Sequence, residues 1–344
     1  MAEVRPRVVV THWVHPEVTD FLAQFSDPVV PPRETGVWPP ARLLELAAGA
    51  EGLIACMADR VDGAFLDRCP RLRIVAATLK GYDNFDAAAC ARRGVWLTTV
   101  PDTIVAPTAE LAVGLVIGLM RRVGEGDREV RSGRFAGWRP QLYGTGLAGS
   151  AVGIAGLGEL GRAIAERLAA FGPEILYCDP RPLPAADGLA LGAARFGLED
   201  LVARSDVIVA AAPLAAGTAG LLGAGVLRRA RPGAFVVNVG RGSVVDEEAI
   251  ADALEQGRLG GYAADVFAME DWALPGRPRQ IPARLLAHPR TLFTPHLGSA
   301  VDGVRRQMSL QSARQVRQAL AGGRPGNAVG PPFPRDDGRH DNLG

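Results

Sequence analysis

Long apolar runs, paired cysteines and a surplus of either charge are all missing from this sequence. Its longest apolar run, Leu111–Met120, is far shorter than the ~20 residues that a membrane-spanning helix needs. The four cysteines form no CxxC and no Cys/His cluster, which argues against a metal site. The formal net charge of +1 leaves no broad basic face for nucleic acid or for an anionic membrane.

The amino-terminal residues contain no apolar stretch of the kind that a signal peptide needs. Cysteines that stand apart are typical of buried, unpaired thiols in a reducing compartment. These two absences predict a cytoplasmic protein. At the other end of the chain, residues 331–344 are rich in proline, glycine and charge, and we expect them to be a disordered tail.

The apolar residues that are present, 48% of the 344, are enough to fill the cores of two domains. Strand-like runs alternate with helical patterns, as they do in parallel α/β sheets. The expected strands span 8–10, 52–55, 73–77, 94–98, 151–155, 174–178, 206–211, 234–239, 262–266 and 291–294. The expected helices include 40–48, 107–122, 162–170 and 304–321.

A glycine-rich motif follows the expected strand at 151–155 directly and leads into the next helix. It reads Gly156-Leu157-Gly158-Glu159-Leu160-Gly161, a G-x-G-x-x-G. In this context the first glycine permits a tight turn, the second lets the backbone approach a pyrophosphate, and the third lets helix and strand pack closely. A corner that needs glycines for packing alone is the alternative.

Asp179 stands at the end of the next expected strand, 18 residues after Gly161. An acidic side chain at this place accepts hydrogen bonds from the adenosine ribose hydroxyls and repels a 2′-phosphate. The sequence therefore predicts NAD as the cofactor, preferred over NADP. Arg181, two residues further on, could soften that preference.

The order of these features predicts an α/β fold with two doubly wound parallel-sheet domains. A Rossmann NAD-binding domain at 104–295 is expected to be inserted into a flavodoxin-like substrate domain, which is built from 1–103 and 296–330. The apolar pattern of the helix at 107–120 is the same for a core helix and for a helix in a subunit interface, so the sequence leaves its role open.

Three polar residues follow expected strands of the second domain: Arg241, Glu270 and His296. Ligands of open parallel sheets bind outside the carboxyl ends of the strands. A base, a carboxylate that orients it and an arginine fork that clamps an anion are what hydride transfer with proton movement needs. Singly, each is more often a solvated charge or a turn residue, but the three together after a dinucleotide motif favour a catalytic set.

The glycine motif, together with residues 239–247, 265–267 and 295–298, resembles the D-isomer-specific 2-hydroxyacid dehydrogenases over roughly residues 5–330. In that family an arginine, a glutamate and a histidine form the catalytic set. The resemblance therefore implies this role for Arg241, Glu270 and His296. It also implies a homodimer.

Four further stretches, 79–86, 137–147, 269–273 and 298–301, are similar to one branch of that family, the phosphite (phosphonate) dehydrogenases. The branch pattern implies that the substrate is contacted by Met57, Lys80, Gly81, Trp138, Tyr143, Arg241, His296, Ser299 and Arg305. With the glycine motif, it implies that the cofactor is contacted by Lys80, Thr108, Gly156, Gly158, Glu159, Leu160, Gly161, Asp179, Ala211, Ala212, Pro213, Val239, Gly240, Arg241, Asp265, His296, Gly298 and Ser299.

Two positions depart from the family pattern. Asp179 stands where the phosphite branch has a glutamate, which shortens the reach of the side chain but keeps its charge. Ala268 stands where the wider family usually has a glutamate, and this position is not the catalytic one.

Phosphite is largely a dianion at neutral pH, so a second cation beside Arg241 would be useful. Lys80 follows an expected strand and precedes a turn, where it can face a cleft, although by residue type alone it would be a surface lysine. On this hypothesis His296 is the base for a water that attacks phosphorus, while Trp138 and Tyr143 shape a dry pocket. Whether His296 or Arg305 positions the water stays open.

Two other functions are compatible with the same catalytic set. An ordinary 2-hydroxyacid dehydrogenase would act on glycerate, glyoxylate or a similar acid, and a side-by-side assay with phosphite and D-glycerate distinguishes it. An NAD-sensing protein similar to transcriptional corepressors would bind a peptide partner, and turnover of any small anion would exclude it. Phosphite is the substrate that the sequence favours.

Overall fold

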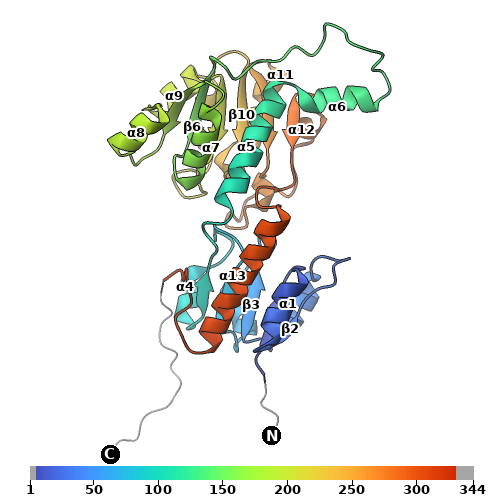
Figure 1. Cartoon of the computed structure of the whole chain (residues 1–344), viewed down its shortest axis with the longest axis vertical. Coiled ribbons are helices and arrows are strands. Elements are labelled where there is room, and N and C mark those ends of the chain that lie inside the picture. The colour runs from blue at the N-terminus through green and yellow to red at the C-terminus, as the bar shows by residue number, and fades with distance from the viewer. Residues whose placement is uncertain (1–4, 331–344) are drawn as a thin grey trace, which may run out of the picture. The chain divides into compact units, whose positions relative to one another are not determined.

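The computed structural model of the chain describes residues 5–330 and divides into two compact units (Figure 1). Unit 1 contains the chain up to Ile104 and from Val301 onward, and unit 2 is Val105–Ala300. The sequence placed the second boundary at residue 296, whereas the segment 296–300 is part of unit 2. The expected disordered tail at 331–344 lies outside the described residues.

Unit 1 contains a five-stranded parallel sheet in the order β2-β1-β3-β4-β5. Its strands are β1 (Arg7–Val10), β2 (Asp27–Val29), β3 (Gly52–Ala55), β4 (Ile74–Ala77) and β5 (Trp96–Thr98). Its helices are α1 (Pro16–Ala23), α2 (Pro40–Ala47), α3 (Gly63–Arg68), α4 (Ala87–Arg92) and α13 (Asp302–Leu320). This is the strand order of flavodoxin-like folds, as the sequence predicted.

Helices cover both faces of the unit 1 sheet because its central strands are apolar on both sides. All four residues of β3 and all four of β4 are buried. Figure 1 shows α1 and α13 over one face, where Val18 and Val316 pack in the same cluster as the strand residue Val8. On the other face, α3 and α4 bury Leu66 and Ala89.

Unit 2 contains a seven-stranded parallel sheet in the order β12-β11-β10-β9-β6-β7-β8. Its strands are β6 (Ala151–Ala155), β7 (Glu174–Cys178), β8 (Ala193–Arg195), β9 (Val207–Ala210), β10 (Ala234–Asn238), β11 (Leu259–Ala264) and β12 (Thr291–Phe293). Its helices are α5 (Val105–Met120), α6 (Val123–Arg131), α7 (Glu159–Ala169), α8 (Ala185–Leu191), α9 (Leu198–Arg204), α10 (Ala224–Leu227), α11 (Glu247–Glu255) and α12 (Ala283–Ala287). This is the Rossmann order with one strand added at the edge.

Helix α5 is part of the core of unit 2. Its Val116 packs in one cluster with Ile164 of α7 and with strand residues of the sheet, and Figure 1 shows α5 and α7 over the same face. The opposite face is covered by α9 to α12, which bury Ile250 and Leu285 among other residues. No helix within residues 5–330 is both long enough and apolar enough to cross a membrane.

The differences from the predicted elements have physical reasons. The sequence missed β2 and β8, which are three-residue edge strands with little apolar pattern. Strand β11 begins at Leu259 rather than at 262 and includes two glycines. A Cβ on Gly260 would lie 2.2 Å from the Gly233 carbonyl oxygen, and one on Gly261 would lie 2.8 Å from a Leu119 methyl. These glycines allow close packing, so here they belong to a strand.

Candidate active site

The glycine motif forms a turn between β6 and α7 that leaves room for a cofactor backbone. Gly156 has a φ of +95°, which glycine adopts without strain. A Cβ on Gly161 would lie 2.1 Å from the Gly156 carbonyl oxygen, so helix and loop are in contact there. At Gly158, which caps α7, no other described atom lies within 4 Å of where a Cβ would be. This open helix terminus fits a pyrophosphate.

Three loops converge at the carboxyl edge of the unit 2 sheet, where β6 and β9 are neighbours and the strand order reverses. A Cβ on Gly156 would lie 2.7 Å from the Ala212 nitrogen, and one on Gly240 would lie 2.5 Å from the Ala212 carbonyl oxygen. Ligands of doubly wound sheets bind at such switch points. The structure thus brings together the predicted cofactor residues that follow β6, β9 and β10.

Asp179 follows β7 and lies against the glycine turn. Its Oδ2 accepts a hydrogen bond from the Leu157 N–H at 2.9 Å, and its Oδ1 accepts one from the Arg181 N–H at 2.8 Å. The carboxylate is therefore fixed beside the glycine motif. This is the position where the sequence predicted the ribose acceptor.

Glu270 and His296 form a pair, with Glu270 Oε2 at 2.5 Å from His296 Nδ1. Glu270 ends the 3-10 turn η2 (Ala268–Glu270), and its Oε1 accepts from the Phe267 N–H at 3.2 Å. The two side chains are only 23% and 29% exposed, so they are shielded but still reachable by a small molecule. Because the carboxylate engages Nδ1, Nε2 is the nitrogen that can take or give a proton.

The backbone of His296 is held in a left-handed conformation with a φ of +56°. Such a conformation is uncommon for a non-glycine residue and tends to persist at functional sites. Oδ1 of the buried Asp265 accepts from the Thr294 hydroxyl and from the Leu297 N–H, each at 2.6 Å. Its Oδ2 accepts from the Gly298 N–H at 2.9 Å. The carboxylate of Asp265 therefore holds the histidine loop, and the predicted contact of Asp265 with the cofactor stays a prediction.

Arg241 is half-buried and leads from β10 into the 3-10 turn η1 (Gly242–Val244). Its Nη1 donates to the Gly240 carbonyl at 3.0 Å. The buried Asn238 shapes this turn, because its Nδ2 donates to the Arg241 carbonyl at 3.0 Å and its Oδ1 accepts from the Gly240 N–H at 3.2 Å. The guanidinium therefore extends from a braced turn at the carboxyl edge of the sheet.

Unit 1 gathers predicted substrate residues at the carboxyl edge of its own sheet. Met57 follows β3, and Lys80 and Gly81 follow β4; all three are half-buried. The Met57 carbonyl accepts from the Asn84 amide at 2.6 Å. Arg305 lies in the first turn of α13, and burial lowers the pKa of its guanidinium.

Sequence reasoning missed three polar residues at this edge of unit 1: His12, Cys56 and Asp59. Burial, with the charge of Arg305 as a smaller cause, lowers the pKa of the buried His12 to about 3, so its imidazole is neutral. Asp59 accepts from the Cys56 N–H at 2.7 Å, and burial raises its pKa. The strand-end position that pointed to the catalytic set would also have pointed to His12. Within residues 5–330, no three His, Cys, Asp or Glu side chains gather as metal ligands would.

Comparison with known proteins identifies the family. The family described as "D-isomer specific 2-hydroxyacid dehydrogenase, NAD binding domain" matches residues 113–298. The glyoxylate reductase of Thermococcus gammatolerans is 34% identical over 318 residues, which cover 91% of this chain and 92% of that protein. The chain belongs to the D-isomer-specific 2-hydroxyacid dehydrogenase family. The glyoxylate reductase of Aeropyrum pernix is 35% identical over 336 residues, 94% of this chain and 96% of that protein.

Two solved structures show the same fold. A protein from Thermus thermophilus has a TM-score of 0.83 and 33% identity, covering 94% of this chain and 100% of that one. The NADPH-dependent glyoxylate/hydroxypyruvate reductase of Sinorhizobium meliloti, solved with NADP and malonate, has a TM-score of 0.79 and 30% identity, covering 96% and 99%. The α/β fold and the NAD-binding domain predicted for this dehydrogenase are therefore confirmed.

We expect this family member to prefer NAD over NADP in kcat/KM because the Asp179 carboxylate would repel a 2′-phosphate. Asp179→Ala should lower the ratio of kcat/KM with NAD to kcat/KM with NADP by roughly fivefold or more. One like-charge contact near solvent costs about 1 kcal/mol or more. Asp200→Ala, which removes an exposed carboxylate on α9, is the control. Equal kcat/KM for the two cofactors in the wild-type protein would overturn this expectation.

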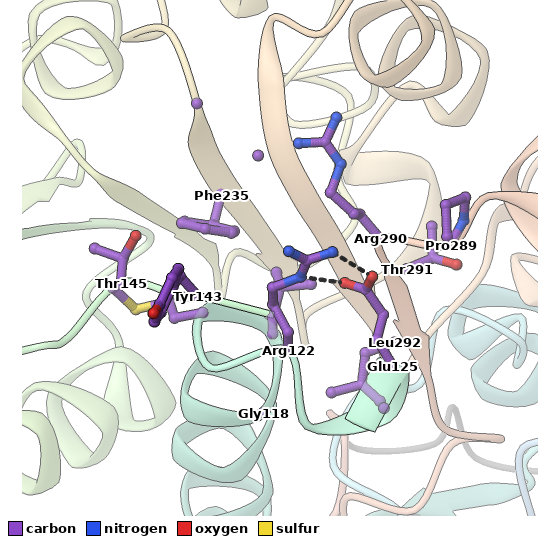
Figure 2. A pocket seen from close by; sticks show the side chains of 16 residues that line it. Gly118, Arg122, Glu125, Tyr143, Thr145, Phe235, Pro289, Arg290, Thr291 and Leu292 are labelled. Atoms are coloured by element: carbon purple, nitrogen blue, oxygen red, sulfur yellow. Dashed lines mark hydrogen bonds and ion pairs between the residues drawn. The ribbon is translucent and has the colours of Figure 1, made fainter. Parts of the chain in front are cut away.

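Within unit 2, Tyr143 lines a pocket and Trp138 is exposed. A pocket of about 220 Å³ opens at the amino edge of the sheet, and its walls include Tyr143 and Phe235, the second residue of β10 (Figure 2). Arg241 follows the other end of β10, roughly 20 Å away at the usual rise of a strand. Trp138 is 84% exposed and so lines no dry pocket in this unit. The predicted contact of both side chains with the substrate stays a prediction.

Proposed function

We propose that the chain transfers hydride between NAD and a small anionic substrate. The observation that carries this is the Glu270–His296 pair, held by Asp265 at the same sheet edge as the glycine motif and Arg241. In this scheme NAD supplies the hydride acceptor. Arg241 clamps the anion, Glu270 orients the imidazole, and His296 takes or gives a proton at Nε2.

The first candidate substrate is a 2-hydroxy acid of the glycerate or glyoxylate type, which the names of the relatives favour. His296 would take the proton of the 2-hydroxyl group as hydride leaves the adjacent carbon, and would return it during reduction. A single carboxylate needs one clamping cation, which Arg241 supplies.

The second candidate substrate is phosphite, which particular residues of this chain favour. Phosphite would lose hydride from phosphorus while water supplies the new oxygen and His296 takes a proton from that water. A dianion calls for a second cation, and we assign this role to Lys80. Lys80 is the single lysine among 38 Lys and Arg residues, and all the others are arginine. An ammonium and a planar guanidinium are not interchangeable at an oxyanion site.

A substrate panel separates the two candidates. NADH formation would be measured with phosphite and with D-glycerate, and NADH consumption with glyoxylate. From Lys80 and its neighbouring sequence we expect the highest kcat/KM with phosphite. A higher value with glyoxylate or glycerate would establish the 2-hydroxy acid instead. No turnover of any small anion would overturn the dehydrogenase assignment and favour a binding protein.

Replacing Lys80 by alanine should raise the KM for phosphite by roughly 10- to 100-fold, because a hydrogen bond to a charged group contributes ~1.5–3 kcal/mol. Lys80→Arg should restore only part of the activity. The NAD affinity should change by a smaller factor than the KM for phosphite, because the glycine motif is in unit 2. Arg92→Ala, an exposed cation in the last turn of α4, is the control.

A single lysine also permits a direct binding measurement. Reductive methylation with ¹³C-formaldehyde labels Lys80 and the α-amino group only. The Lys80 signal should shift on titration with phosphite in the presence of NAD. An unchanged signal and an unchanged KM in Lys80→Ala would show that Lys80 does not contact the substrate.

We also propose that the chain forms a homodimer. Five large apolar side chains of α6 and the following loop are exposed: Val123, Val130, Phe135, Trp138 and Tyr143. We infer that these side chains, which lie within 21 residues of chain, form an apolar surface of the kind that marks protein–protein contacts. Light scattering should give about twice the chain mass of 36.2 kDa, and serine at Phe135 and Trp138 should shift the protein toward a monomer. A monomeric wild-type protein would contradict the proposal.

A further inference from the structure

Two buried carboxylates connect the segment that carries Arg241 to the segment that carries Glu270. We call residues 239–247 the Arg241 segment and residues 265–271 the Glu270 segment. Glu247 ends the first and is 5% exposed; its Oε1 accepts from the Ala268 N–H at 2.8 Å. Asp271 ends the second and is 1% exposed; its Oδ2 accepts from the Ser243 N–H at 2.6 Å. Each segment therefore binds the backbone of the other.

The backbones of the two segments are also in direct contact. A Cβ on Gly242 would lie 1.8 Å from the Phe267 carbonyl carbon and 2.0 Å from the Ala268 nitrogen, so no side chain fits between them. Gly242 is bonded to Arg241, and Ala268 begins the turn that ends at Glu270. A displacement of one segment would therefore displace the other, because packed interiors do not deform freely.

The two carboxylates are costly to bury. Burial, and to a smaller extent the charges of Asp271 and Glu270, raise the pKa of Glu247 to about 7. A neutral amide would accept the same hydrogen bond from the Ala268 N–H at a lower desolvation cost. Buried ionisable groups with shifted pKa values gather at functional sites more often than elsewhere.

We propose that Glu247 and Asp271 are positioning residues that keep the Arg241 guanidinium and the Glu270–His296 pair aligned toward one substrate. The proposal rests on the proposed function, since it assumes that these three side chains act on the same molecule. Supporting hydrogen bonds of this kind set the precision of an active site, and a misplacement of about 1 Å can cost ~100-fold in rate.

The kinetic test compares variants that keep the hydrogen bond with variants that remove it. Glu247→Met and Asp271→Leu have similar volumes but cannot accept, and kcat should fall by roughly 10- to 100-fold in each. Glu247→Gln and Asp271→Asn can still accept and should keep most of kcat. NAD affinity, measured by fluorescence, should change by a smaller factor than kcat in all four, since the glycine motif is held by other contacts.

Glu248→Met is the matched control, because Glu248 is the next residue of α11 and pairs with Arg284 at the surface. A merely structural role predicts a different pattern. In that case the folded fraction of Glu247→Met would turn over at the wild-type kcat, and only its melting temperature would fall. That result would overturn the proposal.

An amide-exchange experiment tests the coupling without any substrate. Glu247→Met removes the acceptor of the Ala268 N–H, and the proposal requires that protection of the Ser243 N–H falls as well, by about tenfold or more. Loss of protection confined to Ala268 would show that the segments are not coupled and would overturn the proposal. Coupled loss of protection in a protein that turns over no small anion would instead locate the failure in the proposed function.

Discussion

Replacing His296 by alanine should lower kcat by ~10²–10⁴ while NAD still binds, because the general base is lost and the glycine motif is untouched. The structure gives this expectation a geometric basis. The imidazole is fixed at Nδ1 by Glu270, and its loop is held by Asp265, so His296→Ala removes a nitrogen that this arrangement orients. The proton would then have to move through solvent.

The measurement is steady-state kinetics with NAD and the best substrate of the panel, together with NAD titration by fluorescence. Glu270→Gln should lower kcat by a smaller factor, since an amide can still orient the ring. Arg241→Ala should raise KM as well as lower kcat, because the substrate clamp is lost. His288→Ala, beyond α12 and outside the catalytic set, is the control. A His296→Ala variant with near-wild-type kcat would show that the base is another group.

The second large effect is a loss of NAD affinity on replacing Gly158 or Gly161 of the glycine motif by alanine. The two substitutions act for different physical reasons. A methyl group on Gly161 would lie 2.1 Å from the Gly156 carbonyl, so Gly161→Ala must push α7 away from the loop. Both NAD affinity and thermal stability should fall, the affinity by about tenfold or more. A methyl group on Gly158 meets no other described atom and would enter the space of the pyrophosphate. Gly158→Ala should therefore lower NAD affinity but leave the melting temperature unchanged.

Gly114→Ala on the exposed side of α5 is the matched control for this pair. It meets no neighbour within 4 Å, and alanine in a helix is more favourable than glycine by about 1 kcal/mol. Its melting temperature should stay equal or rise, with NAD affinity unchanged. If Gly158→Ala binds NAD as the wild-type protein does, the cofactor does not approach this turn.

The strands that the sequence predicted best are those whose whole pattern is local. The expected strands 151–155 and 174–178 agree with β6 and β7 at both ends, because both are short apolar runs bounded by turn residues. The helix after the motif was expected from residue 162, and it begins at Glu159. Its first turn contains the motif's own residues, which the sequence reads as a loop.

Some features of the candidate site can likewise be predicted from local sequence, and others cannot. The positions of Arg241, Glu270 and His296 follow from a rule that the sequence carries by itself, namely that side chains after parallel strands meet at one sheet edge. The contacts that a side chain makes cannot be predicted in this way. The resemblance implies that Asp265 contacts the cofactor, and only the structure shows that its carboxylate accepts three hydrogen bonds from the histidine loop. Only the structure, likewise, shows that the Tyr143 side chain lines a pocket at the amino edge of the sheet.

By itself, the sequence determined the α/β class, the NAD-binding domain and the family, because each depends on patterns within single strand–turn–helix segments. It also predicted a catalytic set from three strand ends. Only the tertiary structure showed that Glu247 binds the Ala268 N–H and Asp271 the Ser243 N–H, across 21 and 28 residues of chain. Contacts of this kind depend on which backbones pack against each other, here through Gly242, and no local pattern encodes that choice. The sequence could therefore name candidate catalytic side chains, while only the tertiary structure shows which contacts hold them in place.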